Sequence, residues 1–303
     1  MQHFAQEYGI AVPRGGGKKP YSARAGRSKP VTSAPQASEN FYALPQKCEV
    51  FWVLNKTDLQ WLHTSLQLGA ASPAVSLVAG VDLEWPLKVG SVRHYKCSLL
   101  QIAVVDKAAS LAVFEGRQQT QAPFHRFDAS AQRPASLDFA STKVFLVDLM
   151  SVPPEDVVPF MAAFFGAAHI TKLGFSFTSD LGEIARTFPA LRNLQITPAL
   201  VDINRIRIPR PGSGDGNGNG GESSSSSGSS NNENNQTSLA RVVQWGLNMH
   251  LDKRQTKSDW SRRPLLRAQE YYAACDAACL VEIYFKCRDA VSASLAPAAT
   301  ASN

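Results

Sequence analysis

Two acidic residues at the end of an apolar run constrain this chain more than any other feature. The run from Val75 to Val81 (VSLVAGV) is rich in β-branched residues and bounded by Pro73 and Pro86, which predicts a buried strand. Asp82 and Glu84 follow at positions i and i+2, so on a strand both side chains point to one face. Adjacent carboxylates at the end of an apolar strand repel one another and are costly to desolvate unless a cation lies between them. A hard divalent ion such as Mg²⁺, which takes oxygen ligands, would supply that cation.

Strand-length apolar runs recur along the chain and alternate with segments of helical period. Alternation of this kind, together with one antiparallel meander, predicts a three-layer α/β domain with a mixed sheet. Besides the acidic strand, strands are predicted at Cys48–Leu54, Ser98–Val105, Ser110–Phe114, Lys143–Leu149, Thr171–Phe175 and Leu200–Ile203.

Local signals also predict where the helices begin. Thr57 and Ser179 are expected to cap two helices, and the pair Pro153 and Pro154 to open a third that ends near Gly166. Asp180 then lies in a first turn, where an acid usually serves only the helix dipole. The expected core-facing residues are Leu59, Leu62 and Leu66 in the first helix and Val157, Val158, Met161, Phe164 and Phe165 in the proline-led one. The remaining helices are predicted from Ser238 onward and over Leu265–Lys286.

Composition divides the chain into one folded domain and several low-complexity segments. Residues 1–45 are expected to form a disordered basic arm, because residues 1–40 hold six of the Lys and Arg residues against two acids. A transit peptide is the alternative, which the absence of an Arg-rich amphipathic helix in the first fifteen residues disfavours. The folded domain should cover 46–289, with a loop insertion at 115–142, a flexible Gly/Ser/Asn-rich insertion at 209–237 and a disordered tail at 290–303.

The same composition argues against membrane and secreted classes. The longest apolar run, Phe160 to Ala168, is too short to span a bilayer, so no membrane partner is expected. Five cysteines without a secretory signal suggest reduced thiols and an intracellular location, with the nucleus favoured over an organelle or the cytoplasm. Cys275, Cys279 and Cys287 have helical spacing and no histidine nearby, which indicates small buried residues rather than a zinc site.

The last predicted helix offers a third carboxylate. Tyr272 and Asp276 are at positions i and i+4 and therefore lie one turn apart on the same face. Asp276 is set in an otherwise apolar segment (YYAACDAACLVEIYF), and a carboxylate on a buried face needs a partner. Taken alone, the pair would favour a plainer interpretation, a surface tyrosine beside a solvated acid.

Three motifs combine these residues. The first is Gly80–Pro86 followed by Ser98–Ala103, the second is Lys172–Leu181, and the third joins Leu251–Lys253, Ser258–Leu265 and Tyr272–Ala277. Together they resemble the DEDD (DnaQ-like, RNase H-like) 3′→5′ exonucleases, in the subgroup with tyrosine in the third motif and in its Werner-type and RNase D-like branch. The resemblance covers roughly Cys48 to Lys286, and the two insertions leave the motifs intact.

The resemblance implies a fold and a reaction. The fold would be an RNase H-like α/β/α arrangement with a mixed sheet of five to six strands. The reaction would be hydrolysis of phosphodiester bonds from the 3′ end of a nucleic acid by two divalent cations, Mg²⁺ or Mn²⁺, with release of nucleoside 5′-monophosphates. Asp82, Glu84 and Asp276 would hold one cation, and Asp82 would bridge to a second that Asp180 helps to position. Tyr272 would orient the attacking water, since a free tyrosine, with a pKa of about 10, disfavours full deprotonation at neutral pH.

Nucleic-acid contacts are predicted at two places. Trp85, beside the paired acids, has an apolar face suited to base stacking, although a core position is an open alternative. The segment before the last helix interleaves basic and aromatic residues, as backbone-binding segments do: Lys253, Arg254, Lys257, Trp260, Arg262 and Arg263. Trp260, Arg262 and Arg263 could instead pack the loop that positions the helix, and the sequence leaves both interpretations open.

Two other functions compete with the exonuclease. One is a catalytically inactive nucleic-acid-binding or scaffold module on the same fold, which the presence of all four acids and the tyrosine disfavours. The other is a phosphorylated interaction hub, which explains only the Ser-rich insertion. The sequence does not distinguish a DNA substrate from an RNA substrate, because two-metal phosphodiester chemistry does not depend on the 2′-hydroxyl. It does not indicate the oligomeric state either.

Overall fold

The computed structural model describes residues 40–45, 47–86, 96–108, 125–126, 134, 137–198, 200–206 and 238–287. The expected strand at Ser110–Phe114, the insertion at 209–237, the tail at 290–303 and most of the arm lie outside these residues, as does most of the loop at 115–142. Residues 40–45 differ from the predicted arm: Tyr42 and Leu44 are buried, and Tyr42 N–H donates to the His250 carbonyl oxygen at 2.8 Å. Tertiary pairing orders this segment, and no pattern within it signals such pairing.

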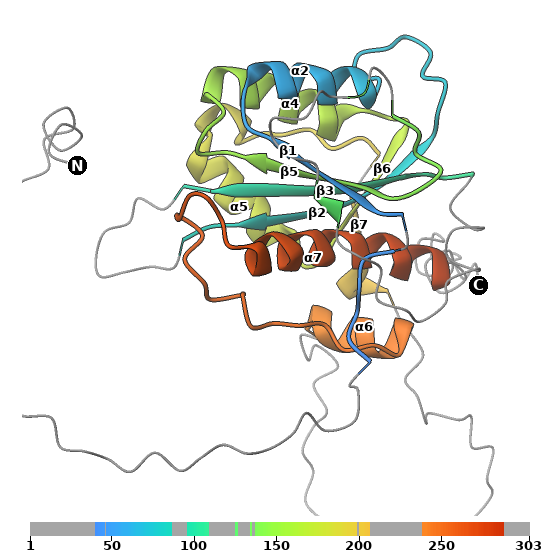
Figure 1. The fold of residues 1–303 in the computed structure, drawn as a ribbon. Helices are drawn as coiled ribbons and strands as arrows, with labels where there is room; N and C mark the ends of the chain where they lie inside the picture. The colour runs from blue at the N-terminus through green and yellow to red at the C-terminus, as the bar shows by residue number, and fades with distance from the viewer. Residues whose placement is uncertain are drawn as a thin grey trace, which may run out of the picture. The chain divides into compact units, whose positions relative to one another are not determined.

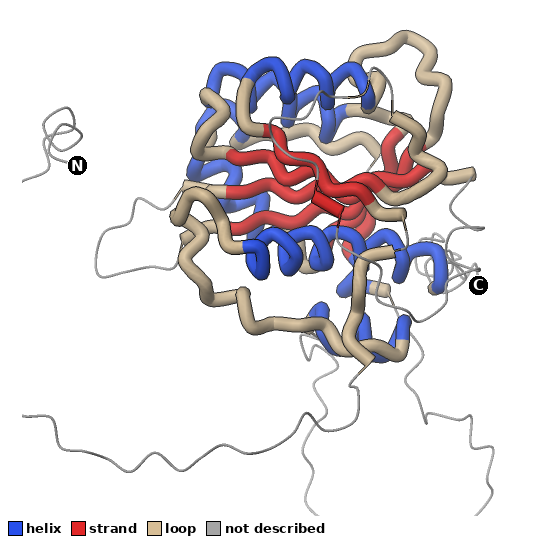
Figure 2. The backbone as a smooth tube through the Cα atoms, viewed as in Figure 1, coloured by secondary structure: helices blue, strands red, loops and turns tan. Residues whose placement is uncertain are grey.

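A mixed sheet forms the centre of the fold (Figures 1 and 2). Its order among the described residues is β4-β1-β5-β3-β2-β6-β7. The strand β3 is antiparallel to both neighbours, and the other pairs are parallel. The strand bounds are β1 Glu49–Val53, β2 Leu77–Glu84, β3 Leu99–Asp106, β4 His125–Arg126, β5 Lys143–Asp148, β6 Ile170–Gly174 and β7 Val201–Asp202. Five strands of five or more residues make up the predicted mixed sheet, and the two-residue strands β4 and β7 extend its edges.

Helices cover both faces of the sheet, which confirms the three-layer α/β/α arrangement (Figure 2). One core cluster joins alternate strand residues to α2, α4 and α5, and the other joins the intervening residues to α6 and α7. In β2 this alternation sends Val81 toward the first cluster and Val78 toward the second. The helix bounds are α2 Lys56–Ser65, α4 Pro154–Gly166, α5 Thr178–Thr187, α6 Leu239–Leu247 and α7 Arg267–Lys286, with 3₁₀ turns η1 Pro189–Leu191 and η2 Ile203–Arg205.

Two of the predicted helix caps are wrong. Asn55, not Thr57, caps α2, because its side chain accepts a hydrogen bond from the Asp58 N–H. Phe177, not Ser179, precedes α5, so Ser179 lies inside the helix while Asp180 keeps its place in the first turn.

The other helix starts agree with the sequence. Ser238 caps α6 through its side chain, and Pro154 opens α4. In α4 the core face contains Phe160, whereas Val158 is only partly buried.

The membrane and cysteine predictions can be compared with the residues that the structure describes. None of their helices is both long and apolar enough to cross a membrane. Cys275 and Cys279 are buried residues of α7, as their helical spacing predicts, and Cys287 is partly buried after it.

Candidate metal centre

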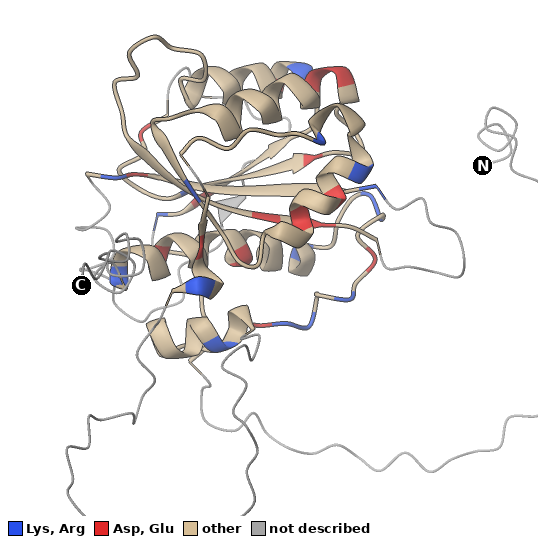
Figure 3. Ribbon diagram, turned by 180° about the vertical axis from the view of Figure 1, so that it is seen from behind, with Lys and Arg blue, Asp and Glu red and all other residues tan. Residues whose placement is uncertain are grey.

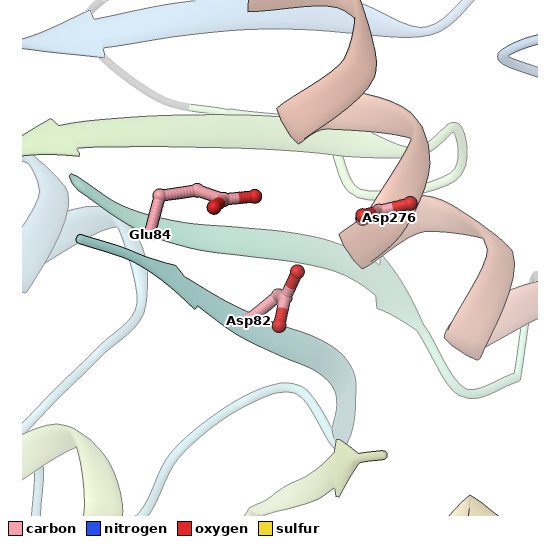
Figure 4. Close-up of side chains that lie close together, drawn as sticks. All are labelled: Asp82, Glu84 and Asp276. Atoms are coloured by element: carbon pink, nitrogen blue, oxygen red, sulfur yellow. The ribbon is translucent and has the colours of Figure 1, made fainter. Parts of the chain in front are cut away.

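Three carboxylates from β2 and α7 converge at one end of the sheet (Figure 4). Asp82, Glu84 and Asp276 each offer an oxygen within 4.8 Å of the others. Asp276 is 2% exposed, and the other two side chains are partly buried. All the donor atoms are oxygens, and a set of three such oxygens suits a hard divalent cation. The residues that the exonuclease resemblance implies as ligands of one cation are therefore neighbours in the fold.

Gly80 allows α7 to approach β2 closely enough for this convergence. It lies two residues before Asp82 on the face of β2 that meets the helix. A Cβ atom placed on Gly80 would lie 2.1 Å from the backbone carbonyl oxygen of Ala277, the residue after Asp276. The glycine is therefore required by the close approach of the α7 backbone.

Substituting Gly80 with alanine should push α7 away from β2. We expect the free energy of unfolding to fall by about 1–3 kcal/mol, because the added methyl group meets backbone rather than a movable side chain. Affinity for Mn²⁺ should fall as well, since Asp276 would retreat with the helix. Denaturant unfolding and calorimetric titration measure the two effects.

Gly166→Ala provides the matched control. A Cβ atom at Gly166, the last residue of α4, has no heavy atom within 4 Å, so the change should leave both quantities nearly unaltered. Equal stability and Mn²⁺ affinity in the two alanine variants would contradict the role assigned to Gly80.

Asp180 lies near the three carboxylates but outside their compact group. It is 6% exposed in the first turn of α5, and the charge of Asp82 acts on it. The turn between β6 and α5 is fixed by Asp202, whose Oδ1 accepts hydrogen bonds from the backbone N–H groups of Ser176 at 2.9 Å and Asn204 at 3.0 Å. Asp202 thus positions the second motif, a role that no spacing in the sequence indicated.

Burial and mutual repulsion dominate the electrostatics of the centre. Burial, followed by the charge of Asp276, raises the pKa of Asp82 to about 7, and burial followed by the charge of Asp82 raises the pKa of Asp180 to about 8. Burial also raises the pKa values of Glu84 and Asp276. The four acids therefore resist ionisation next to one another. A divalent cation would stabilise the site, because its charge offsets the repulsion between the carboxylates.

These raised pKa values predict how the stability of the metal-free protein depends on pH. A carboxyl group with a raised pKa in the folded state holds its proton more tightly there than in the unfolded chain, where the pKa is near 3.8. Its stabilising effect is complete below the unfolded pKa and is lost as pH rises through the folded pKa. In EDTA, the melting temperature should therefore fall from about pH 4 to about pH 8, and saturating Mn²⁺ should flatten the decline.

Thermal unfolding in EDTA and in Mn²⁺ across this range measures both effects. A melting temperature in EDTA that rises with pH over the same window would contradict the arrangement.

Tyr272 and Lys253 complete the immediate surroundings of Asp276. The Tyr272 hydroxyl lies 2.9 Å from Thr256 Oγ1, and burial, with the charges of Asp276 and Glu84, holds the pKa of Tyr272 far above its ordinary value. The Lys253 ammonium donates to both Asp276 oxygens, at 3.0 and 3.1 Å. Lys253 was expected on a nucleic-acid backbone; here it contacts a carboxylate of the centre.

The other expected nucleic-acid contacts divide into residues that pack within the protein and residues that are accessible. Trp260 is fully buried against the Tyr272 ring, with ring centroids 5.9 Å apart, so its indole packs the loop and is unavailable for base stacking. Arg263 donates to both Asp148 oxygens, at 2.7 and 2.8 Å, and to the Ser98 carbonyl oxygen. Trp260 and Arg263 therefore pack the loop before α7, which was the alternative to nucleic-acid contact.

The remaining residues of this set keep accessible surface. Lys257 and Arg262 are exposed, and Arg254 is exposed while paired with Asp252. Trp85 is partly buried against the core beneath α2, α4 and α5. In Figure 3 the loop between α6 and α7, which carries several basic residues, runs on the same side of the molecule as the acidic positions of β2 and α5.

The fold is similar to a known one. It aligns with the crystal structure of the Nibbler EXO domain from Aedes aegypti at a TM-score of 0.50 and 22% sequence identity, covering 81% of this chain and 88% of that one. Fold and site together define an RNase H-like α/β protein built around a cluster of carboxylates.

A family model described as 3′-5′ exonuclease matches residues 135–291, which is more than half of the chain. The chain belongs to this family, which confirms the resemblance to the DEDD exonucleases. Among curated relatives, the exonuclease mut-7 homolog of Homo sapiens is 28% identical over 208 residues, 68% of this chain and 19% of that protein. The homolog from Aedes aegypti is 28% identical over 146 residues, 46% of this chain and 19% of that protein. The chain thus spans about one fifth of the length of these relatives.

Proposed function

We propose that this chain is a metal-dependent 3′→5′ exonuclease that releases nucleoside 5′-monophosphates from the 3′ end of a nucleic acid. The observation that carries the proposal is the convergence of Asp82, Glu84 and Asp276 within 4.8 Å beside a hydrogen-bonded Tyr272. Membership of the 3′-5′ exonuclease family supports the same reaction class.

The carboxylates fit a role as cation ligands. Asp82, Glu84 and Asp276 would hold one Mg²⁺ or Mn²⁺ ion, and Asp82 and Asp180 would serve a second. Bound there, the two ions would supply an acidified water and positive charge beside the departing 3′ oxygen. The chain itself holds the four acids in place through β2, α5 and α7, and keeps them partly or wholly buried, where charge acts strongly.

Tyr272 would orient the attacking water and keep its own proton. Its raised pKa leaves the phenol protonated at neutral pH, so its hydroxyl can donate a hydrogen bond but is a poor base. Thr256 and the buried ring of Trp260 hold that hydroxyl and ring in position. Replacement by phenylalanine removes the donor and leaves the ring packing intact.

The exposed basic residues of the loop before α7 are candidates for contact with the nucleic-acid backbone. Lys257 and Arg262 lack the buried pairing that Arg263 has, so their charges remain available to phosphate groups. Such contacts position a strand without reading its sequence. An intracellular site of action, with the nucleus favoured, belongs to the same proposal, and imaging of a tagged chain tests it.

Digestion of labelled oligonucleotides tests the reaction. DNA and RNA strands labelled at the 5′ end, incubated with Mg²⁺ or Mn²⁺, should shorten progressively from the 3′ end, and EDTA should stop the process. Strands blocked at the 3′ end should resist. Binding of the strands without any metal-dependent shortening would instead favour the inactive nucleic-acid-binding or scaffold module.

A further inference from the structure

Lys253 places a positive charge directly on the carboxylate centre. Its Nζ atom lies 3.0 Å from Asp276 Oδ2, 3.1 Å from Asp276 Oδ1 and 3.4 Å from the Tyr272 hydroxyl. It also lies 5.2 Å from the centroid of the Tyr272 ring. Among the residues that the structure describes, Lys253 is the cation that forms an ion pair with this centre.

The loop around Lys253 fixes the backbone from which its side chain reaches Asp276. The Lys253 carbonyl oxygen accepts hydrogen bonds from the backbone N–H of Thr256 at 3.2 Å and from its Oγ1 at 2.9 Å. The same Thr256 hydroxyl meets the Tyr272 hydroxyl, which ties the turn to α7. Leu251, two residues earlier, is buried in the core beside α6 and α7. The backbone of Lys253 is therefore anchored beside α7, within reach of Asp276.

The ammonium and a divalent cation would compete for the same atoms. Both Asp276 oxygens already accept hydrogen bonds from Lys253. A cation bound to Asp276 would also repel the ammonium at this short distance, since like charges in a partly buried site interact strongly. The Lys253 side chain is 36% exposed, whereas that of Asp276 is 3% exposed, so the lysine has a path to solvent and the carboxylate does not.

We propose that Lys253 is a positioning residue that neutralises Asp276 in the metal-free protein and gives up this contact when a divalent cation binds. The inference rests on the proposed function, because it requires that the centre bind metal. Lys253 keeps the carboxylates assembled before loading, and the entering ion replaces its charge. Once displaced, the ammonium lies at the edge of the centre and is free to meet a phosphate group.

Mn²⁺ binding to a Lys253→Met variant tests the exchange. Calorimetric titration should show a Kd about tenfold lower than that of the wild type, because the ion no longer displaces a charge-assisted contact. In EDTA, the same variant should melt at a lower temperature than the wild type. Lys257→Met removes an equally charged, exposed residue from the same loop and should leave both quantities unchanged.

The outcomes separate the two proposals. A wild-type protein that binds no Mn²⁺ overturns the proposed function itself. A wild-type protein that binds Mn²⁺, with a Lys253→Met variant that binds it equally or more weakly, overturns the exchange and leaves the metal centre standing.

A measurement on the unmodified chain covers the case of a variant that fails to fold. The rate of reductive methylation of the Lys253 amine, followed by mass spectrometry, should rise when Mn²⁺ is added, because the amine leaves its carboxylate partner. A rate that is unchanged or lower with Mn²⁺ overturns the inference.

Discussion

Replacing Asp82 with asparagine should reduce metal-dependent release of mononucleotides by about a thousandfold or more. Asp82 lies beside both Asp276 and Asp180. A carboxylate oxygen of Asp82 is within 4.8 Å of one of Asp276, and the charge of Asp82 raises the pKa of Asp180. Asparagine keeps the shape of the side chain but removes the charge that would bind the cations. Initial rates on a 5′-labelled strand in saturating Mg²⁺ measure the loss.

The stability of the same variant distinguishes lost chemistry from lost folding. Asp82 contributes repulsion to the metal-free centre, so Asp82→Asn should melt in EDTA at the same temperature as the wild type or higher. Glu155→Gln, an exposed acid in the first turn of α4 on the other side of the sheet, should keep full activity. Wild-type rates in the Asp82 variant would refute the catalytic role of the centre.

Replacing Arg263 with methionine should have the largest effect on stability, about 3–5 kcal/mol. The guanidinium pairs with both oxygens of Asp148, whose side chain is 2% exposed at the end of β5. Burial alone would raise the pKa of Asp148, but the contact with Arg263, together with hydrogen bonds from Ser151 and Met150, holds that pKa below its ordinary value. Removing the arginine leaves a buried carboxylate without its counter-charge, and equilibrium unfolding in denaturant measures the cost.

Arg262→Met provides the comparison, because this neighbouring arginine is exposed. It should change the free energy of unfolding by less than about 0.5 kcal/mol. Adding Asp148→Asn to Arg263→Met should restore part of the lost stability, since the double variant contains no unpaired buried charge. If the two arginine variants are equally stable, Arg263 does not anchor the loop, and a role in strand binding becomes the better explanation.

Much of the fold could be predicted because periodicity acts within single elements. Period two placed Asp82 and Glu84 on one face of β2, and helical period placed Tyr272 and Asp276 together on α7. The apolar run before Asp82 became a buried strand with Gly80 facing the helix. Helix starts were harder to predict. Asn55 caps α2 through its side chain two residues before Thr57, and Phe177 precedes α5 without any side-chain cap, two residues before Ser179.

The functions of individual charges were least predictable. Lys253, Arg262 and Arg263 look alike in sequence, as basic residues of one loop. In the structure one meets Asp276, one is exposed and one pairs with Asp148. Charge gives the sign of an interaction but not its partner, and the partner depends on elements that are distant along the chain.

The sequence alone determined the paired acids, the third carboxylate with its tyrosine, and the family motifs. Each of these depends on the spacing of residues within one element or on the order of residues along the chain. Only the tertiary structure decided that β2 and α7 approach closely enough for Asp82, Glu84 and Asp276 to meet. The same packing buried Trp260, paired Arg263 with the buried Asp148 and brought Lys253 onto the centre. The physical reason is that distances between elements are set by the close packing of buried surfaces, which no local pattern encodes.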